Sequence, residues 1–211
     1  LVGYPPEDLL LKPHFIDANL YYLDIIRKEC RDITVLVGFV DRRSDSLYNA
    51  CAIIQDRRIM DVYHKVFLPN YGVFDEKRYF THGDNFSLYS MDECTFSVTI
   101  CEDVWDETYA HVMKQKEVDF IINISASPFH LDKVHTRCRI LSTVARKLNA
   151  SLFYCNLVGG QDEVVYDGTS MVFSSQGKLL ACAARFREDF FTYQYRQTYK
   201  KVSLKIKRRD E

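Results

Sequence analysis

Cys101 is the residue whose place in the sequence most clearly suits chemistry. It follows the apolar, β-rich run Thr95–Ile100 and precedes a segment with helical periodicity, roughly Glu107 to Lys116. A thiol at a strand-to-helix turn is exposed at a sheet edge, and a nearby helix N-terminus favours its thiolate. Such a thiolate attacks carbonyl carbon and forms a covalent intermediate. Position alone leaves open the alternative of a buried structural cysteine.

The neighbours of Cys101 are acidic, and this makes a cation necessary. Glu102 and Asp103 follow it directly, and adjacent negative charge disfavours a thiolate. Lys65 is the candidate cation, because it ends a predicted strand just before the long loop 66–85. It could hold the thiolate and then stabilise the oxyanion formed on attack. The alternative is an ordinary surface lysine.

Composition limits the classes of protein that fit. The 211 residues carry a net charge of −1 and are 47% hydrophobic, which indicates one α/β domain without a nucleic-acid partner. No apolar run approaches the roughly 18 residues of a membrane span, and no signal peptide is visible. The seven cysteines lack CxxC spacing and the six histidines lack metal-finger spacing. We therefore expect reduced thiols, a cytoplasmic location and no metal site.

Strands and helices alternate along the chain, which favours a mixed sheet or paired sheets with helices outside. A stripe at Ile16, Leu20, Leu23 and Ile26 predicts a helix with one buried face. The continuous apolar run Ile33–Val40 predicts a strand buried on both faces. The other predicted strands cover 47–54, 59–65, 95–100, 118–124, 151–156, 169–173 and 178–182, and a second long helix covers 132–148.

Five segments resemble, in order, the glutaminase domain of the glutamine-dependent NAD synthetases, a branch of the nitrilase superfamily. The segments are Gly3–Leu10, Lys65–Phe80, Ile100–Trp105, Asn123–Phe129, and Val158–Glu163 with Asp167-Gly168. The resemblance extends from residue 1 to about 190. It implies a nitrilase-like α-β-β-α sandwich of two mixed sheets with helices outside. Residues 1–211 would form one glutaminase domain that is incomplete at its N-terminus, without the first strand and helix.

The same resemblance assigns expected roles to individual residues. Cys101 matches the nucleophile and Lys65 the lysine of the family's Glu-Lys-Cys triad. Glu76 matches a glutamate near that triad, where it orders Lys65 or the substrate or forms a structural ion pair; Glu102 is a second supporting residue. The residues that match the family's glutamine-binding positions are Tyr71, Ser127 and Lys133.

The general base of the triad has no match in the sequence. The family carries it in a Phe-Pro-Glu segment that would precede Leu1, and the chain starts at Leu1 without a methionine. We therefore expect a longer natural chain and little or no glutaminase activity from residues 1–211 alone. Glu7 matches a different turn and is not assigned this role.

The resemblance also implies a function for the complete protein. Hydrolysis of the glutamine side chain would supply ammonia to a synthetase domain of the same chain, which makes NAD from deamido-NAD with ATP and Mg²⁺. No cofactor is expected in the glutaminase domain, and a homo-oligomer is expected. Two alternatives remain open: an amidase or carbamoylase acting on another substrate, and a module that serves only as a scaffold.

Overall fold

A computed structural model describes residues 1–91, 93–195 and 206–208. The chain folds as two compact units, the first built from residues 1–87 and 98–106 and the second from 88–97 and 107–211. The chain passes between the units after Ser87, within strand β5 (Cys94–Ile100) and again after Asp106.

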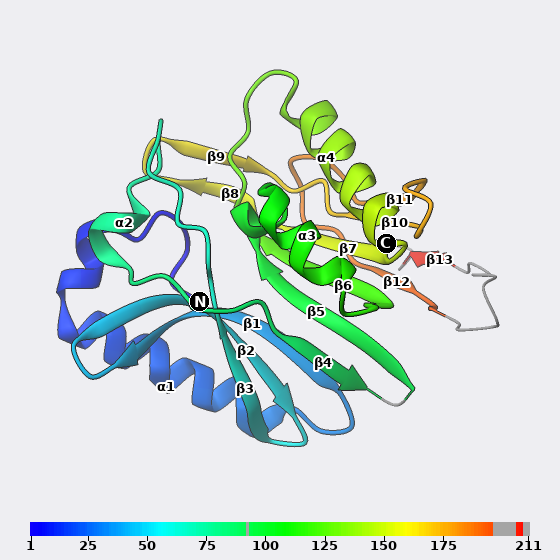
Figure 1. The fold of residues 1–211 in the computed structure, drawn as a ribbon. Coiled ribbons are helices and arrows are strands. Elements are labelled where there is room, and N and C mark those ends of the chain that lie inside the picture. The colour runs from blue at the N-terminus through cyan, green and yellow to red at the C-terminus, as the bar shows by residue number, and fades with distance from the viewer. Residues whose placement is uncertain (92, 196–205, 209–211) are drawn as a thin grey trace. The chain divides into compact units, whose positions relative to one another are not determined.

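The first unit contains a three-stranded antiparallel sheet in the order β1-β2-β3 (Figure 1). Val37 of β1 pairs with Ala52 of β2, and Ala50 of β2 pairs with His64 of β3. Helix α1 contacts β1 and β3. The elements of this unit are η1 (Glu7–Leu11), α1 (Pro13–Glu29), β1 (Thr34–Arg43), β2 (Ser46–Gln55), β3 (Arg58–His64), α2 (Glu76–Tyr79) and the 3₁₀ helix η2 (Cys101–Val104).

The predicted stripe of α1 is confirmed, because Ile16 and Leu23 are buried. Leu23 packs in one cluster with Phe39 of β1 and Ala52 of β2. The prediction for the first strand is wrong in one respect. The stretch Thr34–Gly38 is only half-buried, because β1 is an outer strand of its sheet, and the fully buried run is Ala50–Ile54 in β2.

The second unit contains a mixed six-stranded sheet in the order β11-β10-β7-β6-β5-β4. Strands β6 and β7 run parallel, and α4 connects them and contacts β7 and β10 (Figure 1). The further elements are β4 (Leu88–Met91), α3 (Glu107–Lys114), β6 (Phe120–Ser125), α4 (Lys133–Leu148), β7 (Ser151–Asn156), β8 (Val158–Gln161), β9 (Val164–Asp167), β10 (Met171–Phe173), β11 (Leu179–Cys182), β12 (Phe191–Tyr193) and β13 (Ile206–Arg208).

Several elements are absent from the sequence-based prediction. Strands β8 and β9 form a hairpin where no strand was predicted, since the glycines at 159 and 160 disfavour strands. The short strand β4 and the one-turn helix α2 also lacked a periodic signal. Asp132 occupies the N-cap of α4 but makes no side-chain cap hydrogen bond. Among the described residues, no helix is both long and apolar enough to cross a lipid bilayer.

Candidate active site

A buried ion pair lies at the centre of the candidate site in the first unit. Lys65 follows β3 directly, and its Nζ donates to Glu76 Oε2 at 2.7 Å. The side chains are only 2% and 3% exposed. Of the three possibilities for Glu76, this contact agrees with two, the ordering of Lys65 and a structural ion pair. Breaking such a pair is costly, because the remaining charge is left in an apolar interior.

The second oxygen of Glu76 is also occupied. Asn49 of β2 donates from Nδ2 to Glu76 Oε1 at 2.9 Å. The backbone N–H of Lys65 donates to the carbonyl oxygen of Asn49, also at 2.9 Å. Asn49 therefore fixes both members of the ion pair. It was missed in the sequence, because only the pairing of β2 with β3 brings it to Lys65.

The electrostatic surroundings of Lys65 keep it charged. Burial by itself lowers the pKa of the Lys65 ammonium. The opposing effect is larger, because the Glu76 carboxylate and, after it, Cys101 hold the pKa of Lys65 above its usual value. The ammonium thus remains available to stabilise negative charge on the thiol or on a reacting carbonyl oxygen.

The backbone of Lys65 is fixed by a close approach of Gly83. The Gly83 N–H donates to the Lys65 carbonyl oxygen at 2.7 Å. A Cβ atom on residue 83 would lie 2.3 Å from the carbonyl oxygen of His64, which is far inside van der Waals contact. Only glycine fits at this position without a shift of the strand end that carries Lys65.

We expect Gly83→Ala to lower the free energy of unfolding by about 1 to 3 kcal/mol, because overpacking displaces the backbone. Turnover should fall with it, since Lys65 moves. Denaturant titration and a rate assay measure the two effects. Gly160→Ala is the matched control, because its nearest contact for a Cβ is an ordinary 3.7 Å. Equal stability of the two variants would contradict the expectation.

Cys101 lies at the turn predicted from the sequence, directly after β5. It is the first residue of η2 and has a φ angle of 43°. This left-handed conformation is unusual for a residue with a side chain and is found where surrounding structure enforces it, often at functional sites. The helix that was expected to favour the thiolate, α3, begins only at Glu107. The helix at Cys101 is a four-residue 3₁₀ turn with little dipole, so Lys65 is the main favourable charge for a thiolate.

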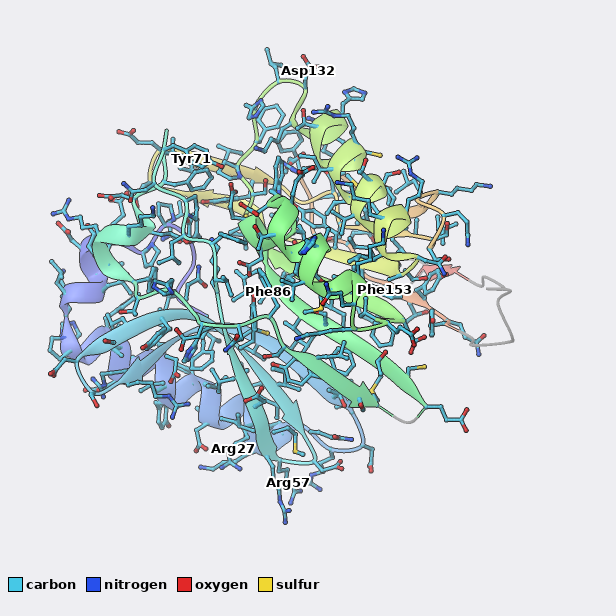
Figure 2. All side chains as sticks on the ribbon, viewed as in Figure 1. Arg27, Arg57, Tyr71, Phe86, Asp132 and Phe153 are labelled. Carbon is cyan, nitrogen blue, oxygen red and sulfur yellow. The ribbon has the colours of Figure 1, made fainter. Side chains whose placement is uncertain are left out.

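Tyr71 and Glu102 lie together beside a cavity of about 780 Å³. The Tyr71 hydroxyl donates to Glu102 Oε1 at 2.8 Å, and burial followed by the Glu102 carboxylate raises the pKa of Tyr71. Tyr71 is half-exposed on the loop between β3 and α2 (Figure 2). The cavity is lined by 66–71, Lys77, 80–82, Glu102, Trp105 and Asp106. Polar and charged side chains, among them Lys77 and Asp106, line it beside apolar ones, and such a mixture suits a small polar ligand.

Asp103 is completely buried, and burial raises the pKa of its carboxyl to about 6. A carboxyl in an unfolded chain has a pKa of about 4, so between these pH values the native state binds the proton more tightly. The stability contribution of this group therefore falls as the pH rises from about 4 to about 6. Between its protonated and its ionised state, the contribution of Asp103 to the free energy of unfolding differs by an amount on the order of 3 kcal/mol.

We expect this effect in denaturant titrations of the wild-type protein and Asp103→Asn at pH 4.5 and 7. The asparagine does not titrate, so the stability difference between the two proteins should shift in favour of the variant at the higher pH. Comparison within the pair cancels the titration of all other groups. A difference that is independent of pH would show that Asp103 does not titrate in this range.

Ser127 and Lys133 belong to the second unit. Ser127 lies after β6 and is buried; its N–H donates to Asn156 Oδ1 at 2.9 Å, while Arg137 Nη2 donates weakly to its carbonyl oxygen at 3.4 Å. Arg137 itself is fully buried and pairs with Asp167 at 2.6 Å. Lys133 is the first residue of α4 and is partly buried. Ser127 therefore lies on the segment between β6 and α4, and Lys133 on the first turn of α4.

Within the described ranges, no group of three or more His, Cys, Asp or Glu residues is placed to hold a metal ion.

A mixed α/β fold with a cysteine at a strand end and a buried lysine–glutamate pair defines a class: domains suited to thiol-dependent hydrolysis. Residues 27–200 match the model of the carbon-nitrogen hydrolase family, and the chain belongs to that family. The glutamine-dependent NAD(+) synthetase of Thermotoga maritima is 43% identical over 91% of the chain, and that of Aquifex aeolicus 42% identical over 91%.

A solved structure is similar over nearly the whole chain. The glutamine-dependent NAD+ synthetase of Acinetobacter baumannii, in complex with ADP, matches 99% of the chain with 35% identity and a TM-score of 0.89. This match confirms the nitrilase-like fold class predicted from the sequence. The chain spans 34% of the length of the two curated relatives above and 39% of the solved one.

Proposed function

We propose that this chain hydrolyses the side-chain amide of glutamine through a thioester on Cys101. The observation that carries the proposal is the buried Lys65–Glu76 pair, whose ammonium is electrostatically coupled to Cys101. The names of the relatives, which are glutamine-dependent enzymes, support the choice of glutamine.

In the proposed first half-reaction, the thiol proton passes to a glutamate and the thiolate attacks the amide carbon. Lys65 stabilises the oxyanion of the tetrahedral intermediate. The carbon–nitrogen bond then breaks, and the glutamate returns its proton to the departing ammonia. We place that glutamate in the segment upstream of Leu1, as the family resemblance implies.

In the second half-reaction the same catalytic glutamate residue removes a proton from water. The hydroxide attacks the thioester carbon, and the carbon–sulfur bond breaks. The product, free glutamate, leaves, and the catalytic glutamate residue returns its proton to the Cys101 thiolate. Glu76 keeps Lys65 in place during both steps and does not transfer protons, because both of its oxygens accept hydrogen bonds.

For substrate binding we assign the cavity beside Tyr71. A free amino acid carries one ammonium and one carboxylate. Glu102 and Asp106 are anionic residues on the cavity wall, and we assign the ammonium to Glu102, which Tyr71 orients. Ser127 and Lys133 are proposed as substrate-binding residues because the family resemblance implies it, with Lys133 for the α-carboxylate.

For the complete protein we propose that residues 1–211 are the glutaminase domain of a longer chain. The ammonia would pass to a synthetase domain, which uses ATP and Mg²⁺ to convert deamido-NAD to NAD. The glutaminase domain itself needs no cofactor. A cytoplasmic location and a homo-oligomeric assembly belong to the same proposal.

The test is ammonia release from L-glutamine by the complete gene product, measured beside asparagine, a simple aliphatic amide and an N-carbamoyl amino acid. Turnover of glutamine well above the other compounds supports the proposal. An inert glutamine with turnover of another amide would replace it by the amidase or carbamoylase alternative. Residues 1–211 alone form a second arm and should release little ammonia; release at the rate of the complete protein would contradict the upstream base.

A further inference from the structure

We infer that Asp103 is a positioning residue, whose carboxylate joins the turn that carries Cys101 to the backbone that follows Lys65. The inference extends the proposed function, because it names the group that sets the relative positions of the nucleophile and the cation. Asp103 is fully buried, and no role was assigned to it from the sequence.

One carboxylate oxygen of Asp103 fixes the start of the loop between β3 and α2, which carries Tyr71. Asp103 Oδ1 accepts from the backbone N–H of Val66 at 3.1 Å and of Phe67 at 2.9 Å. These two residues directly follow Lys65 and lead toward Tyr71. The bond pair therefore holds the backbone at the point where β3 ends and the loop begins.

The other oxygen fixes the turn at the nucleophile. Asp103 Oδ2 accepts from the backbone N–H of Ile100 at 2.9 Å and from the Tyr63 hydroxyl at 2.8 Å. Ile100 immediately precedes Cys101, so this bond closes a tight loop around the thiol-bearing residue. It restrains the backbone next to the left-handed φ of Cys101.

A carboxylate is the side chain that this arrangement requires. Four donors from three segments converge on two oxygens, and an ionised carboxylate accepts up to about four hydrogen bonds. Asparagine offers one acceptor oxygen and one NH₂ group. Two of the four donors would then face the NH₂ group, which is itself a donor, and would lose their acceptor. The buried negative charge is retained although burial disfavours it, which is consistent with its contribution to orientation.

Asp103 acts through the backbone and through Lys65, and not on the substrate. Its side chain is fully buried, and both carboxylate oxygens already accept hydrogen bonds from the protein. Its charge is one of the contributions that keep Lys65 protonated. Loss of Asp103 should therefore impair the attacking geometry more than the affinity for glutamine.

The test uses the complete gene product with Asp103→Asn, Tyr63→Phe and the control Asp84→Asn, which removes an exposed carboxylate next to Gly83. Two readouts are taken: kcat and KM for glutamine, and the rate at which iodoacetamide alkylates Cys101, followed by mass spectrometry of its peptide. For Asp103→Asn we expect kcat and Cys101 alkylation each to fall about tenfold or more, with KM within threefold. Tyr63→Phe leaves the three backbone donors in place and should lower both rates only two- to threefold.

If the variant were simply unfolded, alkylation of Cys101 would rise and not fall, and the buried cysteines would be alkylated as well. Unchanged kcat and alkylation in Asp103→Asn, or a change in KM alone, would overturn the inference. If Asp103→Asn does not fold, Tyr63→Phe decides, and wild-type rates in it overturn the inference. Alkylation of Cys101 is measured without glutamine. A wild-type protein that does not hydrolyse glutamine would therefore contradict the proposed function, while the alkylation rates would still test the role of Asp103.

Discussion

Replacing Cys101 with serine is expected to reduce ammonia release from glutamine by about 10³-fold or more. A serine hydroxyl is far less acidic than a thiol, so the same base and cation form far less of the attacking anion. The fold should be unaffected, since the two side chains have nearly the same shape. Initial rates of ammonia release, measured with the complete gene product, check the loss.

Cys94→Ser is the matched control for this variant. Cys94 begins the same strand, β5, that ends just before Cys101, and it is also partly buried. The control should keep the wild-type rate. Glutamine turnover that persists in Cys101→Ser and disappears in Cys94→Ser would show that the nucleophile was assigned to the wrong cysteine.

Replacing Lys65 with methionine is expected to affect both activity and stability. Methionine keeps much of the length and apolar character of the side chain but removes the ammonium, so the oxyanion loses its cation and kcat should fall by about 10²- to 10³-fold. Glu76 is then left buried and unpaired, and breaking a buried pair lowers the free energy of unfolding by about 3 to 5 kcal/mol. Steady-state kinetics and denaturant titration measure the two effects.

The double variant Lys65→Met with Glu76→Gln separates these effects. It removes both charges, while the glutamine retains an acceptor oxygen for Asn49, which donates to Glu76 Oε1 in the wild-type protein. Much of the lost stability should return, whereas activity should not. If activity returns together with stability, Lys65 has only a structural function and the proposed oxyanion contact is wrong.

The sequence alone was sufficient for most local features of the protein. The apolar stripe of α1, the strand before Cys101 and the turn at the thiol were all predicted, because side-chain periodicity reflects which face of an element is buried. The motifs around Lys65 and Cys101 also identified the family, since they are long and occur in a fixed order. These features depend on residues that lie close together in the chain.

Only the tertiary structure placed the groups that hold the site together. Asn49 reaches Glu76, which lies 27 residues further along the chain, through the register of β2 and β3. Asp103 collects donors from segments up to 40 residues away. Neither side chain has a local pattern that distinguishes it from a surface polar residue. Such partners are set by strand pairing and by the burial of charge, which depend on the whole fold and not on any short segment.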